Sequence, residues 1–225
     1  VKPETGTESL SGLFSRAAQS LGLPRPELFQ KRDLTVPLLY APSNPAATIA
    51  ARSLMSVHTV PEVRFELGYH LTMYRGEHYL RCLEPTEEGL RTLLFAAIRA
   101  ARPGAELPEA LPEGADKTVR MIRDGLSPAK AERLAASVDE VLRRKDPLDV
   151  EPWLGEAEMT ACRAGLLLCG DIACAARMIE RYQHEPRNRS HADTVRRLVA
   201  FSVSEGYFRL RHAVGFSIDD RVPGG

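Results

Sequence analysis

Apolar side chains recur every three or four residues through most of this sequence, which is the spacing of one buried face of an α-helix. Gly22 with Pro24 ends the first helical segment, and Gly170-Asp171 separates a long apolar helix from its successor. The pattern predicts helices at about 10–21, 61–74, 87–98, 116–124, 128–144, 172–183 and 191–209. It also predicts a long apolar helix that Asp149 and Pro152 introduce and that contains residues 157–169.

The segment between the first two helices has a different pattern. LFQKRD, LTVPLLYAPS and ATIAARSLM are short apolar stretches separated by polar residues, and they predict short strands. Pro37, Pro42 and Pro45 confine such a sheet to short or edge strands. Residues 101–116, ARPGAELPEALPEGAD, are rich in proline and glycine and predict an exposed loop. We therefore expect one mostly helical α+β domain over 1–225, with a small N-terminal β-sheet.

Composition excludes several classes of function. Thirty basic side chains balance thirty acidic ones, so no net field favours nucleic acid or an anionic membrane. The longest apolar stretch, at 164–174, is interrupted and falls short of the roughly 20 residues that cross a bilayer. The chain begins VKPETGTES, with no initiator methionine or signal-peptide pattern, and we expect a domain excised from a longer protein.

Four cysteines are present, without a C-x-x-C pair, and they predict reduced, mostly buried thiols in a cytoplasmic protein. They are Cys82, Cys162, Cys169 and Cys174.

The segment RFELGYHLTMYRGEH has the outline of a zinc-hydrolase helix. In H-E-x-x-H, two histidines one turn apart hold the metal, and the glutamate between them is the general base. Here Glu66 is followed by Leu67 and Gly68. Phe65 and Tyr69 stand where the two histidines should be.

The surrounding chain resembles the CAAX-prenyl-protease and HtpX-type zinc metallopeptidases. In that family a short sheet precedes the H-E-x-x-H helix, and the third zinc ligand is a glutamate in a string like E-x-E-A-D-R-x-G. The string EMTACRAG, at Glu158–Gly165, is similar, with Thr160 at the ligand position and Cys162 at that of the following Asp. The continuation GDIACAARMIER is also similar, so the resemblance covers roughly Leu34 to Arg181. The positions that agree in the string are Ala161, Arg163 and Gly165.

The resemblance implies a zincin-like fold without the family's activity. Phenyl and phenol rings do not replace imidazole on zinc, and threonine is a poor ligand beside a carboxylate. With Phe65, Tyr69 and Thr160 at the three ligand positions, we expect no metal and no other cofactor. Glu66 then has no metal-bound water to deprotonate. We expect instead an aromatic plug in the core, and Glu66 either at the surface or paired with Arg163.

Two alternatives remain open from the sequence. Glu66 and His70 are four residues apart and His78 follows, which could form a displaced metal site of a hydrolase. A helical adaptor unrelated to peptidases is the other alternative, and it would lack a sheet beside the Glu66 helix. The favoured hypothesis is a catalytically inactive, metallopeptidase-like module of a larger bacterial protein that binds protein partners.

Overall fold

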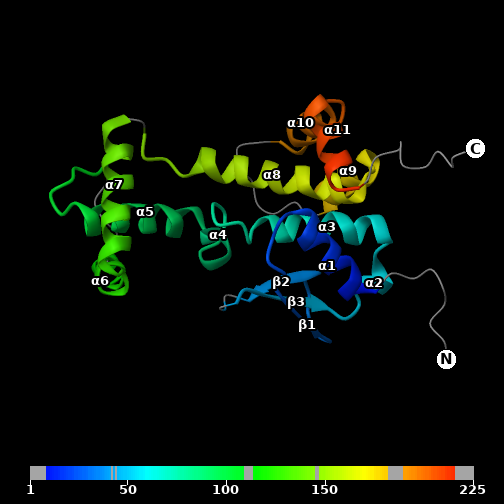
Figure 1. Cartoon of the computed structure of the whole chain (residues 1–225), viewed down its shortest axis with the longest axis horizontal. Helices are drawn as coiled ribbons and strands as arrows, with labels where there is room; N and C mark the ends of the chain where they lie inside the picture. Colours follow the sequence, from blue (N-terminus) through cyan, green and yellow to red (C-terminus); the bar gives the residue numbers. More distant parts are fainter. Residues whose placement is uncertain are drawn as a thin grey trace, which may run out of the picture. The chain divides into compact units, whose positions relative to one another are not determined.

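The computed structural model describes residues 9–41, 43, 45–108, 114–144, 147–181 and 190–215 (Figure 1). It is mostly helical, with one small sheet near the N-terminus, and this confirms the predicted α+β class. Contacts divide the chain into two compact units, a division that the sequence pattern does not predict. Unit 1 combines Val1–Leu83 with Gly155–Gly225, and unit 2 is Glu84–Leu154. Unit 2 is thus inserted between the two segments of unit 1.

The sheet of unit 1 has three strands in the order β1-β3-β2. Strand β1 (Glu27–Lys31) runs parallel to β3 (Ala47–Ala51), and β2 (Leu38–Ala41) runs antiparallel to β3. The register places Leu28 and Tyr40 on either side of Thr48, and Phe29 and Leu39 on either side of Ile49. Because side chains alternate along a strand, these two rows lie on opposite faces of the sheet.

Three helices cover the inner face of the sheet. They are α1 (Leu10–Ser20), α2 (Leu54–Val57) and α3 (Val60–Thr72). The predicted start of α3 is confirmed: Pro61 lies in its first turn, and the Thr59 side chain and Glu62 form a reciprocal capping box. Helices α1 and α3 share a core with the inner face, and its largest fully buried side chains are Phe14, Leu54, Leu67 and Leu71.

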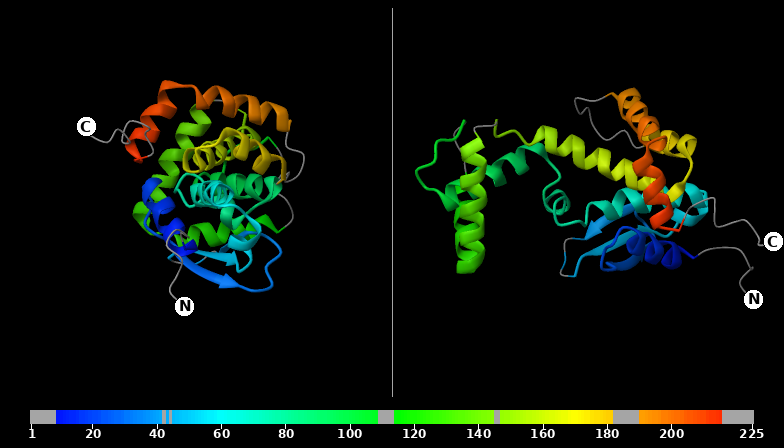
Figure 2. Two further views of the ribbon diagram at one scale, coloured as in Figure 1. Left: turned by 90° about the vertical axis from the view of Figure 1, so that its right-hand side faces the viewer. Right: turned by 45° about the horizontal axis from the view of Figure 1, so that its top comes forward.

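The second segment of unit 1 contains α8 (Glu151–Cys169) from Gly155 onward, followed by α9 (Ile172–Arg181), α10 (His191–Ser202) and α11 (Glu205–Ala213). Gly170 adopts a φ of 69°, and Asp171 Oδ1 accepts from the N–H groups of Ala173 and Cys174, so α8 ends and α9 begins where predicted. Within unit 1, the sheet lies on one side of α3, and α9 with α10 lies on the other (Figure 2).

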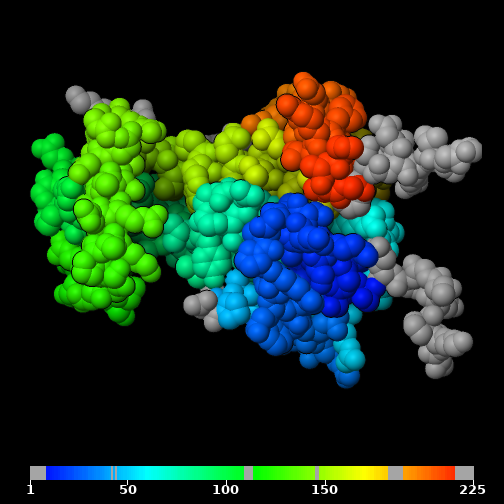
Figure 3. All heavy atoms as spheres, viewed as in Figure 1, coloured from blue at the N-terminus to red at the C-terminus, as the bar shows by residue number. Residues whose placement is uncertain are grey.

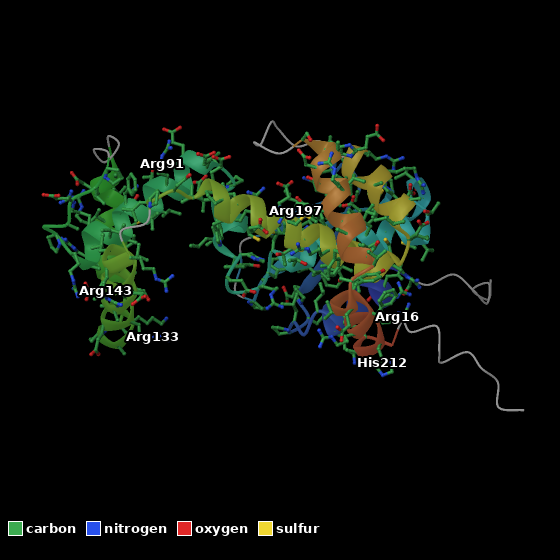
Figure 4. All side chains as sticks on the ribbon, turned by 90° about the horizontal axis from the view of Figure 1, so that it is seen from above. Arg16, Arg91, Arg133, Arg143, Arg197 and His212 are labelled. Atoms are coloured by element: carbon green, nitrogen blue, oxygen red, sulfur yellow. The ribbon has the colours of Figure 1, made fainter. Side chains whose placement is uncertain are left out.

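The prediction of one last helix over 191–209 is wrong. Helix α10 stops at Ser202, and the Ser204 hydroxyl accepts from the Tyr207 N–H as the cap of a new helix. A serine hydroxyl that accepts from a backbone N–H three residues later favours the start of a new helix over continuation of the old one. This explains the break. Arg197 of α10 donates to both carboxylate oxygens of Glu156 on α8, at 2.9 and 3.1 Å (Figure 4).

Unit 2 is built from α5 (Glu87–Ala101), α6 (Ala115–Gly125) and α7 (Pro128–Arg144), and α4 (Leu80–Leu83) precedes it in unit 1. Of the predicted loop over 101–116, residues 102–108 lie outside helices, whereas Ala101 ends α5 and Ala115 is a buried residue of α6. Residues 109–113 of that loop lie outside the described residues.

Among the described residues, no helix combines the length and the apolar character that crossing a membrane requires.

Candidate functional site

Helices α3 and α8 cross in direct backbone contact at two glycines. A Cβ added to Gly68 would stand 2.6 Å from the carbonyl oxygen of Ala164 and 2.8 Å from Cα of Gly165. Real Cβ atoms do not approach backbone this closely, so only glycine fits at residue 68. Three ligands of one zinc surround a common point, so the resemblance predicts that the helix of Phe65 and Tyr69 packs against the helix of Thr160, and this contact is present.

Phe65 fills the space beside this crossing. Its side chain is 2% exposed and packs in a cluster with Met159, Cys162 and Leu166 of α8. A Cβ on Gly165 would lie 2.8 Å from Cδ2 and Cε2 of the Phe65 ring. The position of the first expected zinc ligand is thus occupied by a tightly packed apolar ring.

The other two ligand positions are engaged in ordinary helix contacts. Tyr69 is half-buried, and its hydroxyl donates to Glu158 Oε1 over 3.4 Å, while its ring stacks on Phe65 with centroids 6.5 Å apart. The Thr160 hydroxyl donates to the Glu156 carbonyl at 2.8 Å, one turn back on the same helix. Glu156 is the residue that Arg197 holds.

Glu66 is buried, with 9% of its surface exposed, and this excludes the surface carboxylate considered from the sequence. The Arg163 guanidinium lies over the ring of Phe201 on α10, 5.4 Å from the ring centroid. Arg163 Nε is buried and, among the described residues, has no hydrogen-bond partner. The Glu66–Arg163 pair stays a prediction.

A second set of polar groups lies where the C-terminal half of α3 meets the inner face of the sheet. His70 is 4% exposed and Thr48 is fully buried, with 3.0 Å between His70 Nε2 and Thr48 Oγ1. Thr48 Oγ1 is also 3.0 Å from the Tyr74 hydroxyl, and that hydroxyl donates to the Ala47 carbonyl at 2.5 Å. Helix α3 and strand β3 are therefore joined by a buried polar chain.

The hydrogen bond from Tyr74 to the Ala47 carbonyl determines which group donates in each of the other hydrogen bonds of this polar chain. The Ala47 carbonyl can only accept, so Tyr74 uses its single proton there and must accept from Thr48. Thr48 has then used its own proton and must accept from His70 Nε2–H. His70 therefore carries a proton on Nε2. Burial lowers the pKa of His70 from 6.5 to about 3, in agreement with a neutral ring.

Tyr40 of β2 completes the surroundings of His70. Its ring stacks on the imidazole with centroids 4.0 Å apart and planes 5° from parallel, and its hydroxyl contacts the His70 carbonyl at 3.3 Å. Burial raises the pKa of Tyr40 well above 10.0, and burial likewise raises that of Tyr74 to about 12. All three rings are therefore uncharged at neutral pH, which suits a structural polar core.

The alternative metal site from Glu66, His70 and His78 does not assemble. His70 Nε2 faces Thr48, and His78 Nδ1 lies 3.3 Å from the carbonyl of Thr72. In the part of the chain that the structure describes, no three His, Cys, Asp or Glu side chains gather as a metal site would require.

Two shallow hollows in unit 1 lie away from the α3–α8 crossing. One, of about 400 Å³, lies between α9 and α10. The other, of about 350 Å³, is lined by residues 34–37, by α2, and by His58 and Arg181. Burial and the neighbouring Arg181 charge lower the pKa of His58, and Arg181 itself lies 3.8 Å from the Glu62 carboxylate.

Sequence reasoning missed the polar chain. Thr48 lies inside a predicted strand and Tyr74 at a predicted helix end, and nothing in their spacing indicates that the two meet. The available signal was the period of two along a strand, which places Thr48 on the same face of β3 as Ala50, a fully buried residue.

Comparison of the chain with protein-family models, with curated proteins and with solved structures gives no match.

Proposed function

We propose that unit 1 is a zincin-like domain that has lost its metal and now serves as a protein-interaction module of a larger bacterial protein. The observation that carries this proposal is the packing of Phe65 against Gly165 at the crossing of α3 and α8. A metal with its water would need that volume, and an aromatic ring restores packing where such a centre is lost.

The chemistry of the three positions agrees with a loss of catalysis. Carbon rings and a hydroxyl that is already bonded to the backbone give zinc no adequate ligand set. Without a metal-bound water, a carboxylate such as Glu66 cannot act as the general base of a peptidase. The proposal therefore assigns Glu66 a structural role.

Both alternatives from the sequence are less well supported. A hydrolase with a displaced metal needs His70 as a ligand, yet His70 directs Nε2 to Thr48 within a closed polar chain. A helical adaptor unrelated to peptidases would have no sheet beside the Glu66 helix, yet Tyr40 and Thr48 of the sheet contact α3.

Exposed apolar side chains support an interaction role. Phe29 and Leu39 are 54% and 43% exposed on the outer face of the sheet, and Val203 and Phe208 are 72% and 59% exposed near the turn between α10 and α11. Apolar groups gathered at a surface commonly mark contacts with other proteins.

Restoring the three zinc ligands tests whether unit 1 descends from a zinc peptidase. We expect the triple variant F65H/Y69H/T160E to bind one zinc ion, seen as a rise in Tm on adding Zn²⁺, because binding to the native state alone is stabilising. The matched control is F65H/Y69H/T160Q, which has the same two histidines and nearly the same volume without the carboxylate. The wild-type protein should show no such rise.

Two outcomes would count against the proposal. A folded triple variant whose Tm responds to zinc no more than that of the control would remove the support for a peptidase origin. Stoichiometric zinc in the wild-type protein, lost in the His70→Gln variant, would favour the displaced-site hydrolase instead.

A further inference from the structure

The two edges of the small sheet differ in how they are protected. Strand β2 lies between Pro37 and Pro42 in the sequence, and the Tyr79 hydroxyl contacts the Ser43 carbonyl just beyond its end. Strand β1 is also preceded by a proline, Pro26, but all its residues except Leu28 are exposed, whereas β2 has only one exposed residue, Leu39. The blue part of Figure 3, which includes β1, forms a continuous piece of the surface of unit 1. An unprotected edge strand is a template for pairing with another strand.

The backbone groups at this open edge can be identified from the ladder. The Glu27 N–H donates to the Ala46 carbonyl, and the Lys31 carbonyl accepts from the Arg52 N–H, both at 3.0 Å. Because successive residues of a strand direct their backbone groups to opposite sides, residues 27, 29 and 31 face β3. Leu28 and Gln30 therefore present their N–H and C=O groups to the open edge.

The charges along this strand are antisymmetric about its central residue. Glu27 precedes Phe29 by two residues, and Lys31 follows it by two. Arg25 and Asp33, four residues before and after Phe29, continue the pattern with opposite signs. If two such strands run antiparallel with their Phe29 residues opposite each other, Glu27 faces Lys31 and Arg25 faces Asp33, while Arg32 faces the uncharged Pro26. A parallel arrangement would place like charges together.

We propose that two copies of this chain associate through antiparallel pairing of their β1 strands, centred on Phe29. Leu28 of each copy then pairs with Gln30 of the other, and their backbones exchange four hydrogen bonds. The two Phe29 residues form the non-hydrogen-bonded pair, in which side chains approach most closely. Glu27 of each copy lies opposite Lys31 of the other.

The pairing also extends an apolar row across the sheet. Leu39, Ile49 and Phe29 are direct neighbours in register on the outer face. Joining two sheets at β1 makes one six-stranded sheet in which this row continues through both Phe29 rings. The contact is small, so we expect a dissociation constant in the micromolar range or weaker. The pairing uses only the edge of the sheet and does not depend on a peptidase origin.

Charge reversal tests the register directly. The measurement is the molar mass of the full chain in a concentration series, by sedimentation equilibrium at low salt. Glu27→Lys and Lys31→Glu should each weaken the dimer by about tenfold or more, because two attractive pairs become repulsive. The double variant E27K/K31E should regain the wild-type affinity. An equimolar mixture of the two single variants should form a heterodimer, since each variant supplies the charge that the other needs.

A backbone variant tests the edge itself. Gln30→Pro removes an N–H that faces away from β3, so the native ladder keeps its bonds while the proposed interface loses two of four. It should be monomeric with an unchanged circular dichroism spectrum. The matched variant is Phe29→Pro, which removes a ladder bond and should lower Tm.

Three results would overturn the proposal: a monomer at every concentration up to the millimolar range, a dimer that Gln30→Pro leaves intact, or single charge variants that fail to form a heterodimer when mixed. None of these results would bear on zinc binding by the ligand-restored variant, so the two proposals fail separately.

Discussion

The ring of Phe65 lies so close to Gly165 that a single methyl group on residue 165 would stand 2.8 Å from two of its carbons. The opposite glycine, Gly68, has an even closer neighbour in the backbone of Ala164. A Cβ on residue 165 would meet the Phe65 ring at 2.8 Å and the Phe65 carbonyl oxygen only at 3.0 Å, whereas a Cβ on residue 68 would meet backbone atoms alone, at 2.6 and 2.8 Å. The crossing of α3 and α8 therefore excludes a Cβ more strictly at residue 68 than at residue 165.

Gly68→Ala should therefore be more destabilising than Gly165→Ala. We expect Gly68→Ala to lower the free energy of unfolding by about 3 kcal/mol or more, and Gly165→Ala by about 1–3 kcal/mol, the range for overpacking a core. Urea denaturation measures both. Gly206 of α11 is the control, since a Cβ there meets only the Ser204 hydroxyl oxygen at 3.8 Å and alanine favours the helix. Equal losses at 68 and 165 would contradict the assignment.

Phe65→Ala should destabilise unit 1 by about 3–5 kcal/mol, the usual cost of emptying a buried aromatic site. Phe208→Ala is the matched control, because that ring is 59% exposed, and its loss should change the free energy of unfolding by less than about 1 kcal/mol. Chemical denaturation followed by circular dichroism distinguishes the two. A small loss for Phe65→Ala would mean that the ring is not the plug of the crossing.

The Thr48 hydroxyl should contribute more to the free energy of unfolding than the Thr48 methyl group does. Thr48→Val keeps the shape but leaves the His70 N–H without an acceptor, and should cost about 1–3 kcal/mol. Thr48→Ser keeps the hydroxyl and removes one methyl, which should cost about 1 kcal/mol. Comparison of their denaturation midpoints tests the deduced chain of donors. The deduction fails if the valine variant is the more stable of the two.

His70 should make stability depend on pH in a defined window. The folded protein holds the pKa of His70 at about 3, whereas the unfolded chain has a value near 6.5. Between these values only the unfolded state binds the proton, so the free energy of unfolding falls as pH falls, by up to about 1.4 kcal/mol per pH unit. Above pH 6.5 this contribution is constant.

The His70→Gln variant isolates that contribution, because its amide still donates but does not titrate. As pH falls from 6.5 to 4.5, the free energy of unfolding of the wild type should decrease steadily relative to that of the variant. A difference that stays constant over this range would mean that the ring is accessible to protons in the native state.

The cysteine thiols should react slowly in the native protein. Burial raises the pKa of both Cys82 and Cys169 to about 12, which lowers the thiolate fraction on the order of 10³-fold relative to a pKa of 9.0. Cys162 and Cys174 are buried outright. Titration with a disulfide reagent at pH 8 should therefore show little reaction until a denaturant is added. Rapid native labelling of Cys82 or Cys169 would show that its thiol is more accessible than the structure places it.

Sequence reasoning located most helices because capping residues and apolar spacing act locally. Thr59, Pro61 and Glu62 define the start of α3 within one turn, and Asp171 does the same for α9. It missed the break at Val203, since the apolar spacing continues through the Ser204 cap. The polar chain and the Gly68–Gly165 contact join residues that are distant in sequence, and no periodicity within one element carries that information.

Unit 1 is discontinuous, with Glu84–Leu154 between its two segments. During synthesis, α3 leaves the ribosome long before the part of α8 that carries Gly165. Until then Phe65 lacks the α8 surface that it packs against in the folded unit, and exposed apolar surface of this kind favours aggregation. If unit 2 folds first, it brings the ends of the intervening segment closer and lowers the entropy cost of closing unit 1. The inserted unit thus determines when the N-terminal segment of unit 1, which is synthesised first, can complete its core.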